Sequence, residues 1–301
     1  MKILVTGAEG FIGSHMASFL TRKGHGVLAI PKAIDLRDYS YLSSFFQGID
    51  QVYHFAANMG GVGFFSENNY QPFIDNILMD VNVFRACQDA GVKRLFYPSS
   101  ACAYPVNIQQ VEQSAPALKE TQLIPANADR MYGWEKLVMT LLAKESPLDI
   151  RVGILNTVFG EGQTWVGERV KFPPAITYKV LHAKKNGGPI SIWGNGNQTR
   201  TLLYIDDAIE KIYEIMNTEG YWGEVNVASD EVVTVKQCAD WLCEIAGITP
   251  SYKFELDKPS GVLARGIDNS KFNEHYSYRS KYTTREGFEK LYNWMEAELW
   301  T

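Results

Sequence analysis

The sequence predicts an α/β protein: a Rossmann-type, doubly wound parallel sheet with a smaller C-terminal substrate-binding domain. Short apolar segments alternate with helical segments through the first half of the chain, which is the pattern of a parallel sheet covered by helices. The pattern Gly7-x-x-Gly10-x-x-Gly13 lies directly between a first strand, 2–6, and a helical segment that runs to about residue 23. Polar residues follow the later strands at their carboxyl ends, where ligands bind in such sheets.

The composition is that of an ordinary globular protein. The chain has 301 residues, 46% hydrophobic and 21% charged, which is enough for one large or two modest domains with a buried core. Because the net charge is −5 and the basic residues are scattered, we expect no nucleic-acid partner. No apolar run approaches about 18 residues, so we expect neither a membrane span nor a signal peptide. The cysteines form no C-x-x-C pair, which favours a cytoplasmic location and no metal site: Cys87, Cys102, Cys238 and Cys243.

The first turn predicts a dinucleotide cofactor. Glycines at positions 7, 10 and 13 allow a tight turn and a close approach of backbone to a pyrophosphate at the start of the helix. The second strand, 27–30, is followed by Pro31-Lys32, whereas an acid that binds the ribose 2′-hydroxyl is expected there. Asp35 comes later. Because Lys32 or Arg37 would suit a 2′-phosphate, NAD is expected and NADP stays open.

The third strand, 51–55, leads into two small residues and a glycine-rich loop. Ala56 and Ala57 leave room for a cofactor across the sheet, and the loop 58–63 either touches a ligand with its backbone or is a mobile turn. His54 lies within the apolar strand and is interpreted as a packed core histidine. A long helix over about 69–90 follows, with apolar residues at helical spacing: Ile74, Ile77, Leu78, Val81 and Phe84.

Catalytic residue types gather around the fourth strand, 94–98. Ser99, Ser100 and Cys102 follow its carboxyl end, and Tyr132 and Lys136 lie four residues apart on one face of a later helix. If that helix lies beside the strand end, a base, a cation and a thiol share one cavity. A phenol needs a lowered pKa to act as a base at neutral pH, and the ammonium of Lys136 would lower it.

Later segments complete a cleft. A strand over 149–154 ends near Asn156, the loop 161–169 has the composition of an active-site loop, and Lys171 leads a helical segment. We expect residues 1–158 plus roughly 200–230 to form the cofactor domain, and 159–199 plus 231–301 to form the substrate domain.

Two motifs carry a family resemblance. The glycine pattern together with Tyr132-x-x-x-Lys136 resembles the extended short-chain dehydrogenase/reductase family, which includes sugar-nucleotide epimerases and dehydratases. Within that family the subgroup of GDP-mannose 3,5-epimerases is most similar, through Met59–Phe64, Ser99–Pro105, the interval from Trp165 to Lys171, Gln198–Arg200 and Gly261–Asn269. The GDP-fucose synthases are also similar, but they carry a histidine at the position of Lys171 and lack the Thr164-Trp165 loop.

The resemblance implies an enzyme with tightly bound NAD that oxidises C4 of a nucleotide-diphosphate sugar and inverts C3 and C5. Tyr132 and Lys136 would serve the oxidation, Cys102 and Lys171 would be the acid–base pair, and Ser100 would hold the C4 oxygen. A homodimer through 69–90 and 129–146 is expected. The implied cofactor contacts are Gly7, Gly10, Phe11, Ile12, Gly13, Asp35, Leu36, Ala56, Ala57, Asn76, Ser99, Tyr132 and Lys136. The implied substrate contacts are Gly60, Ser100, Ala101, Cys102, Asn156, Val170, Lys171, Phe172, Lys179, Gln198, Thr199, Arg200 and Arg265, the two arginines suiting the diphosphate.

Simpler interpretations stand beside these roles. A cysteine at a strand end is more often a small buried apolar residue, and a single lysine is usually a solvated surface charge. Other enzymatic alternatives are a 4-epimerase, a 4,6-dehydratase or a 4-keto reductase of another nucleotide sugar. A dinucleotide-binding regulator without chemistry is the alternative of another class, and the intact Tyr132/Lys136 pair argues against it.

Overall fold

A six-stranded parallel sheet forms the centre of the larger part of the molecule. The computed structural model describes residues 1–110 and 117–300. Every pair of neighbouring strands in this sheet runs parallel, so the predicted fold class is confirmed. In sheet order the strands are β10 (Val225–Val227), β6 (Asp149–Leu155), β4 (Arg94–Ser100), β3 (Gln51–His54), β1 (Lys2–Thr6) and β2 (Gly26–Ala29).

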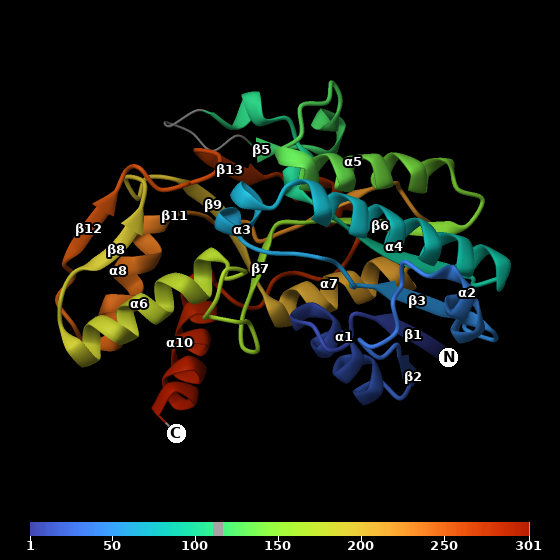
Figure 1. Ribbon diagram of the computed structural model, residues 1–301, viewed down its shortest axis with the longest axis horizontal. Coiled ribbons are helices and arrows are strands. Elements are labelled where there is room, and N and C mark those ends of the chain that lie inside the picture. The colour runs from blue at the N-terminus through green and yellow to red at the C-terminus, as the bar shows by residue number, and fades with distance from the viewer. Residues whose placement is uncertain (111–116, 301) are drawn as a thin grey trace.

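Helices cover both faces of this sheet. Helices α1 (Phe11–Arg22) and α7 (Ile205–Asn217) pack together on one face, and α4 (Tyr70–Asp89) and α5 (Arg130–Glu145) pack together on the other (Figure 1). The crossover from β2 to β3 is short and contains α2 (Tyr39–Leu42) and a 3-10 turn at Ser43–Phe46. The switch in strand order beside β1 places the glycine-rich turn at the carboxyl edge of the sheet.

The buried face of helix α4 is partly polar. Leu78 and Val81, predicted as part of its apolar face, are 45% and 41% exposed, whereas the polar residues Asn76 and Asp80 are almost fully buried. The buried side chains of α4 belong to a hydrogen-bonded polar cluster, which offsets the cost of removing them from water. Apolar spacing alone therefore does not show which side of this part of the helix is buried.

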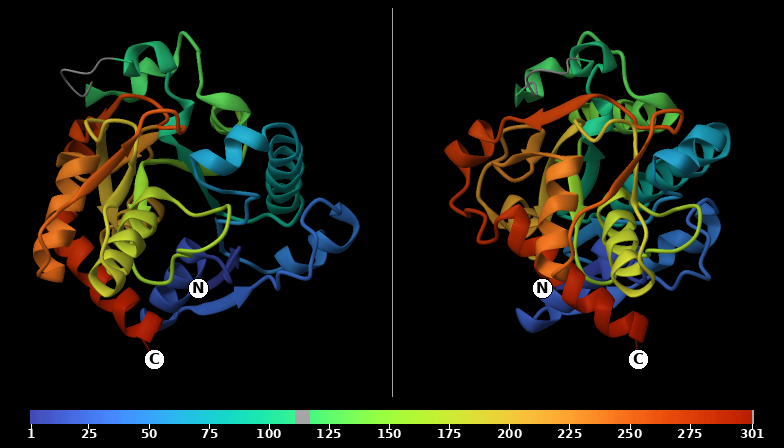
Figure 2. Two further views of the ribbon diagram at one scale, coloured as in Figure 1. Left: turned by 60° about the vertical axis from the view of Figure 1, so that its left-hand side comes forward. Right: turned by 90° about the vertical axis from the view of Figure 1, so that its left-hand side faces the viewer.

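A second group of elements comes mainly from the C-terminal half of the chain. Helices α6 (Phe172–Asn186), α8 (Val235–Ala246) and α10 (Thr284–Trp300) pack on one another (Figure 2). A five-stranded sheet contains β11 (Val232–Thr234), β9 (Thr199–Tyr204), β13 (Ala264–Ile267), β5 (Ala117–Leu118) and β7 (Thr157–Phe159), and β12 (Tyr252–Glu255) pairs with β8 (Ile190–Trp193). The remaining short helices are α3 (Val62–Glu67), α9 (Ser270–His275) and 3-10 turns at Ala101–Ala103, Val106–Gln109 and Glu120–Leu123. The division into two domains at the predicted boundaries stays a prediction.

Residues 1–110 and 117–300 contain neither a candidate membrane span nor a candidate metal site. None of their helices combines the length and the apolar character needed to cross a bilayer. No group of three or more His, Cys, Asp or Glu side chains among them is arranged to hold a metal ion.

Candidate active site

The glycine-rich turn forms a cradle that only glycine permits. Gly7 has φ +66°, and a Cβ there would lie 2.6 Å from the backbone nitrogen of Ala56. A Cβ on Gly13 would lie 2.1 Å from the carbonyl oxygen of Gly7. Helix α1 begins at Phe11, so its first N–H groups are close to this cradle. The shape and the helix N-terminus both fit a dinucleotide pyrophosphate.

The segment after β2 is rich in paired charges. Arg37 makes 2.7 Å ion pairs with both Asp35 and Asp75, so its guanidinium is held between two carboxylates. The carboxylate of Glu9, within the glycine-rich turn, accepts a 2.8 Å hydrogen bond from the backbone nitrogen of Lys32. An acid therefore does lie at the end of β2, although it comes from the turn and not from the strand.

The end of β4 meets the start of α5 in direct contact. A Cβ on Gly133 would lie 2.2 Å from the carbonyl oxygen of Cys102, and the backbone nitrogen of Asp129 donates to the same oxygen at 2.9 Å. The Ser100 hydroxyl accepts a 3.2 Å hydrogen bond from the backbone nitrogen of Cys102. Tyr132 consequently packs beside Cys102 and stacks on Phe65, with the ring centres 4.8 Å apart. The juxtaposition predicted for Ser100, Cys102 and Tyr132 is present.

The electrostatic setting of Tyr132 differs from the expectation. Burial raises the pKa of its phenol above the usual value, and the ammonium of Lys136 and the hydroxyl of Ser100 only partly counteract this. Lys136 faces inward: its Nζ lies 2.9 Å from Glu135 Oε1 and donates to the Tyr97 hydroxyl at 3.1 Å. The same Nζ is 6.0 Å from the centre of the Tyr132 ring. The charge of the Lys136 ammonium, which we expected to act on the Tyr132 phenol, is thus shared with the carboxyl group of Glu135.

Cys102 lies against a guanidinium group. Arg265 Nη1 is 3.3 Å from Cys102 Sγ, its Nη2 is 3.3 Å from Asp129 Oδ2, and its Nε donates to Gln109 Oε1 at 2.6 Å. Although burial acts to lower it, the pKa of Arg265 lies above the usual value because of Cys102 and Asp129. Burial, together with the positive charge of Arg265, lowers the pKa of Arg200 to about 10. Two crowded guanidinium groups beside a thiol form a site that favours an anion.

Lys171 reaches this region through two loops in contact. A Cβ on Gly61 would lie 2.2 Å from the carbonyl oxygen of Val170, and Arg169 Nη1 donates to Asn58 Oδ1 at 2.8 Å and to the Met59 carbonyl at 2.7 Å. Lys171 follows as the residue that caps the start of α6. Burial lowers the pKa of its ammonium, and the nearby Cys102 acts in the opposite direction. Lys171 and Cys102 are therefore close enough to interact electrostatically.

Three predicted substrate contacts carry a polar atom with nothing to bind. Within the described part of the chain, Asn156 Nδ2, Gln198 Oε1 and Thr199 Oγ1 are buried without a hydrogen-bond partner. Unpaired buried polar atoms are rare, and a ligand would satisfy them. Lys179, in contrast, donates to the Ser191 carbonyl at 2.9 Å, so its ammonium already has a protein partner.

The other predicted residues lie as follows. Asn76 binds the backbone nitrogen of Asn58 at 2.7 Å and Glu135 at 3.2 Å, and the Ser99 hydroxyl accepts from Thr140, so both side chains hold the scaffold. Gly10, Phe11 and Ile12 form the end of the turn and the start of α1, Leu36 is buried after β2, Ala56 and Ala57 follow β3, Gly60 precedes α3, Ala101 follows β4, and Phe172 begins α6.

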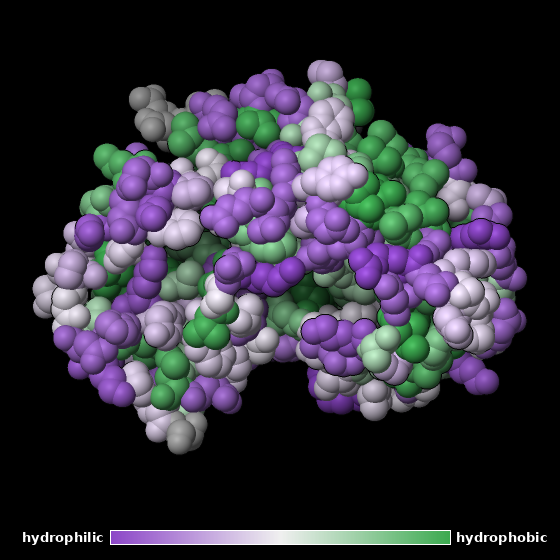
Figure 3. Space-filling view, viewed as in Figure 1, coloured by the Kyte–Doolittle hydropathy of each residue, from purple (hydrophilic) through white to green (hydrophobic). Residues whose placement is uncertain are grey.

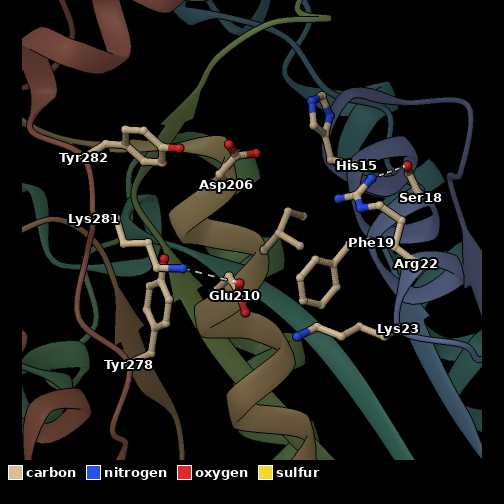
Figure 4. A pocket seen from close by; sticks show the side chains of 11 residues that line it. His15, Ser18, Phe19, Arg22, Lys23, Asp206, Glu210, Tyr278, Lys281 and Tyr282 are labelled. Atoms are coloured by element: carbon tan, nitrogen blue, oxygen red, sulfur yellow. Dashed lines mark hydrogen bonds and ion pairs between the residues drawn. The ribbon is translucent and has the colours of Figure 1, made fainter.

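A cavity of about 520 Å³ lies outside this group of residues. It is formed between α1, α7 and the segment before α10, and none of the predicted site residues lines it (Figure 4). The space-filling view shows a hollow between the regions of α3 and α1 (Figure 3). The chemistry-bearing side chains thus gather away from the 520 Å³ cavity.

Several residues of the site escaped prediction. Asp129 and Gln109 bind Arg265, and Glu135 binds Lys136, yet none of the three was singled out. The signal for Glu135 was present, since it is the acid inside the Tyr132-x-x-x-Lys136 motif. Gln109 lies only four residues after the Ser99–Pro105 motif, but its partner Arg265 is 156 residues away in the chain, so the sequence gave no signal for their contact.

Comparisons with known proteins bear on the family and the fold of the chain. The family model described as "NAD dependent epimerase/dehydratase family" matches residues 3–228. The chain is 30% identical to GDP-mannose 3,5-epimerase of Arabidopsis thaliana over 99% of this chain and 83% of that protein, and 26% identical to GDP-L-fucose synthase 1 of the same plant over 97% and 92%. Among solved structures, UDP-glucose 4-epimerase of Thermotoga maritima with UDP-glucose superposes with a TM-score of 0.85 at 23% identity, covering 99% of this chain and 100% of that one, which supports the fold.

Proposed function

Because the chain belongs to the NAD dependent epimerase/dehydratase family, we propose that it is a nucleotide-sugar epimerase that inverts C3 and C5 of a GDP-hexose, as a GDP-mannose 3,5-epimerase does. The observation that supports the proposal is that Cys102 packs beside Tyr132 and that Lys171 lies near enough to Cys102 for the two groups to affect each other electrostatically. Oxidation at C4 alone requires neither of these two groups. An additional acid and base at the same site point to proton exchange on the sugar ring.

The residues present fit an NAD cofactor. The cradle at Gly7 and Gly13 leaves room for a pyrophosphate that any Cβ would fill. When bound, NAD supplies a hydride acceptor that later returns the hydride. Tyr132 takes the proton of the C4 hydroxyl, Ser100 binds the C4 oxygen, and Lys136 stabilises the phenolate.

The C4 ketone acidifies the hydrogens on C3 and C5. Cys102, as a thiolate beside Arg265, removes such a proton, and Lys171 returns one to the opposite face of the ring. Arg200 and the unpaired polar atoms of Gln198 and Thr199 bind the substrate, with the guanidinium on the diphosphate.

The paired charges after β2 favour NAD over NADP. Arg37 is already held by Asp35 and Asp75, so it is not a free partner for a 2′-phosphate. The carboxylate of Glu9 at the same place would repel that phosphate.

The exposed face of α4 and α5 supports a homodimer. Apolar side chains gather on the surface where Figure 1 places these helices, as the green area of Figure 3 shows. Exposed apolar patches of this kind mark interaction sites. The exposed residues are Leu78, Val81, Val138, Leu141 and Leu142.

Isotope exchange tests the reaction. The protein is incubated with GDP-mannose in heavy water, and the recovered sugar is examined by NMR for deuterium at C3 and C5. Mass spectrometry of the cofactor released on denaturation identifies NAD or NADP. Cys102→Ala should lose the exchange and keep cofactor binding; absence of deuterium in the wild-type product would refute the epimerase for this substrate. Net consumption of added NADPH would instead indicate a 4-keto reductase.

A further inference from the structure

A buried polar network lies beneath Tyr132 and Lys136. It joins the sheet to two helices: His54 of β3, Tyr97 of β4, Asp80 of α4, and Glu135 and Lys136 of α5. Each of these side chains is at most 5% exposed. The network stands apart from Cys102 and Lys171, and the proposed reaction assigns no role to its two carboxyl groups.

The two carboxyl groups share their partners. The Tyr97 hydroxyl is 3.0 Å from Asp80 Oδ2 and 3.0 Å from Glu135 Oε1, and Lys136 Nζ is 2.9 Å from Glu135 and 3.9 Å from Asp80. His54 Nε2 is 2.8 Å from the other oxygen of Asp80. Two buried carboxylates that share the Tyr97 hydroxyl cannot both ionise at little cost.

The groups that surround Asp80 and Glu135 determine which of the two carboxyl groups is protonated. Burial raises the pKa of Glu135 to about 7, with the charge of Asp80 adding to the effect and Lys136 opposing it. Although burial acts to raise it, the pKa of Asp80 lies below its usual value because of Lys136 and His54. Near neutral pH Asp80 is therefore the carboxylate, and Glu135 holds or releases the shared proton.

The charge of Glu135 reaches Tyr132 through Lys136. An ionised Glu135 compensates the ammonium and raises the pKa of the phenol, as does the nearby Cys102. A protonated Glu135 leaves more of the ammonium charge for Tyr132.

We propose that Glu135 is a positioning residue: the proton that it shares with Asp80 sets how strongly Lys136 stabilises the phenolate of Tyr132. The inference rests on the proposed role of Tyr132 as the base, and it adds an ionisable group that controls that base. Proton loss from Glu135 raises the pKa of Tyr132. The phenolate population, and with it C4 oxidation, therefore increases less steeply with pH in wild type than in Glu135→Gln through the range in which Glu135 titrates.

The test follows Tyr132 without any substrate. Ultraviolet difference titration of wild type against Tyr132→Phe gives the ionisation midpoint of this one phenol, and the same comparison is made in a Glu135→Gln background. The amide mimics the protonated carboxyl, so the midpoint should fall by about one pH unit or more. Glu145→Gln, an exposed change at the end of the same helix, is the matched control and should leave the midpoint unchanged.

Stability gives a second readout. The pKa of Glu135 is raised from 4.5 to about 7 by folding, so its stabilising contribution is complete below 4.5 and is lost as the pH rises towards 7. Between pH 4.5 and about 7, the melting temperature of wild type should therefore fall relative to that of Glu135→Gln. The difference in melting temperature between wild type and Glu145→Gln should stay constant over the same range. Infrared spectroscopy of wild type containing isotope-labelled glutamate follows the buried glutamic acid even if the variant does not fold.

The outcomes separate this inference from the proposed function. An unchanged Tyr132 midpoint in Glu135→Gln overturns the inference. Infrared evidence that no buried glutamic acid remains about one pH unit below neutrality overturns it as well. A lack of deuterium exchange with GDP-mannose would refute the epimerase and leave the Tyr132 titration to decide on Glu135.

Discussion

Lys171 stands at the start of α6 with its ammonium partly removed from water. Burial lowers its pKa, so it gives up its proton at a lower pH than a surface lysine. That property suits a general acid, because a group with a lowered pKa donates its proton more readily.

We predict that Lys171→Arg abolishes inversion. Arginine keeps the positive charge and cannot give up a proton, so deuterium incorporation should fall by roughly 100-fold or more while substrate binding remains. In wild type, exchange should decline on the alkaline side at a pH below the usual lysine value of about 10.4, because the acid is protonated only below its pKa. Lys185→Arg, exposed on the same helix, is the control. A Lys171→Arg enzyme that still exchanges would remove the general-acid role.

Sequence reasoning located the reacting groups better than their partners. Ser100, Cys102 and Tyr132 were predicted together because a strand end and a helix face have fixed periodicities. The partners of Arg265 were not, since Gln109 and Asp129 reach it only through tertiary packing of segments about 130 to 160 residues away in the chain. The inward direction of Lys136 was missed for the same reason, because it depends on Asp80 and Tyr97 in other elements.

At the level of elements, α5 depends on one glycine to reach the Ser/Cys strand end. A helix-interior glycine is usually less stable than alanine by roughly 0.5–1 kcal/mol. Gly133 is nevertheless required, because a Cβ there would lie 2.2 Å from a backbone oxygen.

Gly133→Ala should therefore destabilise the protein by roughly 1–3 kcal/mol and displace Tyr132 from Cys102. Thermal unfolding and deuterium exchange measure the two effects. Gly26→Ala is the comparison, because its Cβ would lie at an ordinary 3.7 Å from the Met1 carbonyl. If Gly133→Ala stabilised the protein, the backbone at Cys102 would be able to move away from the added Cβ at no loss of stability, and the prediction would be wrong.

Helix α4 shows the limit of periodicity. The sequence predicted its existence and approximate span, yet its polar Asn76 and Asp80 face inward and Leu78 faces out. The buried polar residues belong to a network with other elements, and a network of this kind is not visible in the spacing of one helix.

At the scale of the molecule, the α4/α5 face predicts assembly. Leu142→Glu, at a site 45% exposed, should convert a particle of twice the chain mass into one of the chain mass in light scattering. Leu256→Glu, 75% exposed in the turn after β12, should leave the mass unchanged. A wild-type protein that is monomeric at every concentration would contradict the homodimer.

The contact between Gly61 and Val170 has a consequence for engineering. The loop 58–63 and the loop that delivers Lys171 meet backbone to backbone, and Arg169 fastens them while stacking 4.1 Å from the Phe64 ring. Neither loop has space to change its path alone. A loop graft that installs a different residue at position 171 must therefore transplant both segments together.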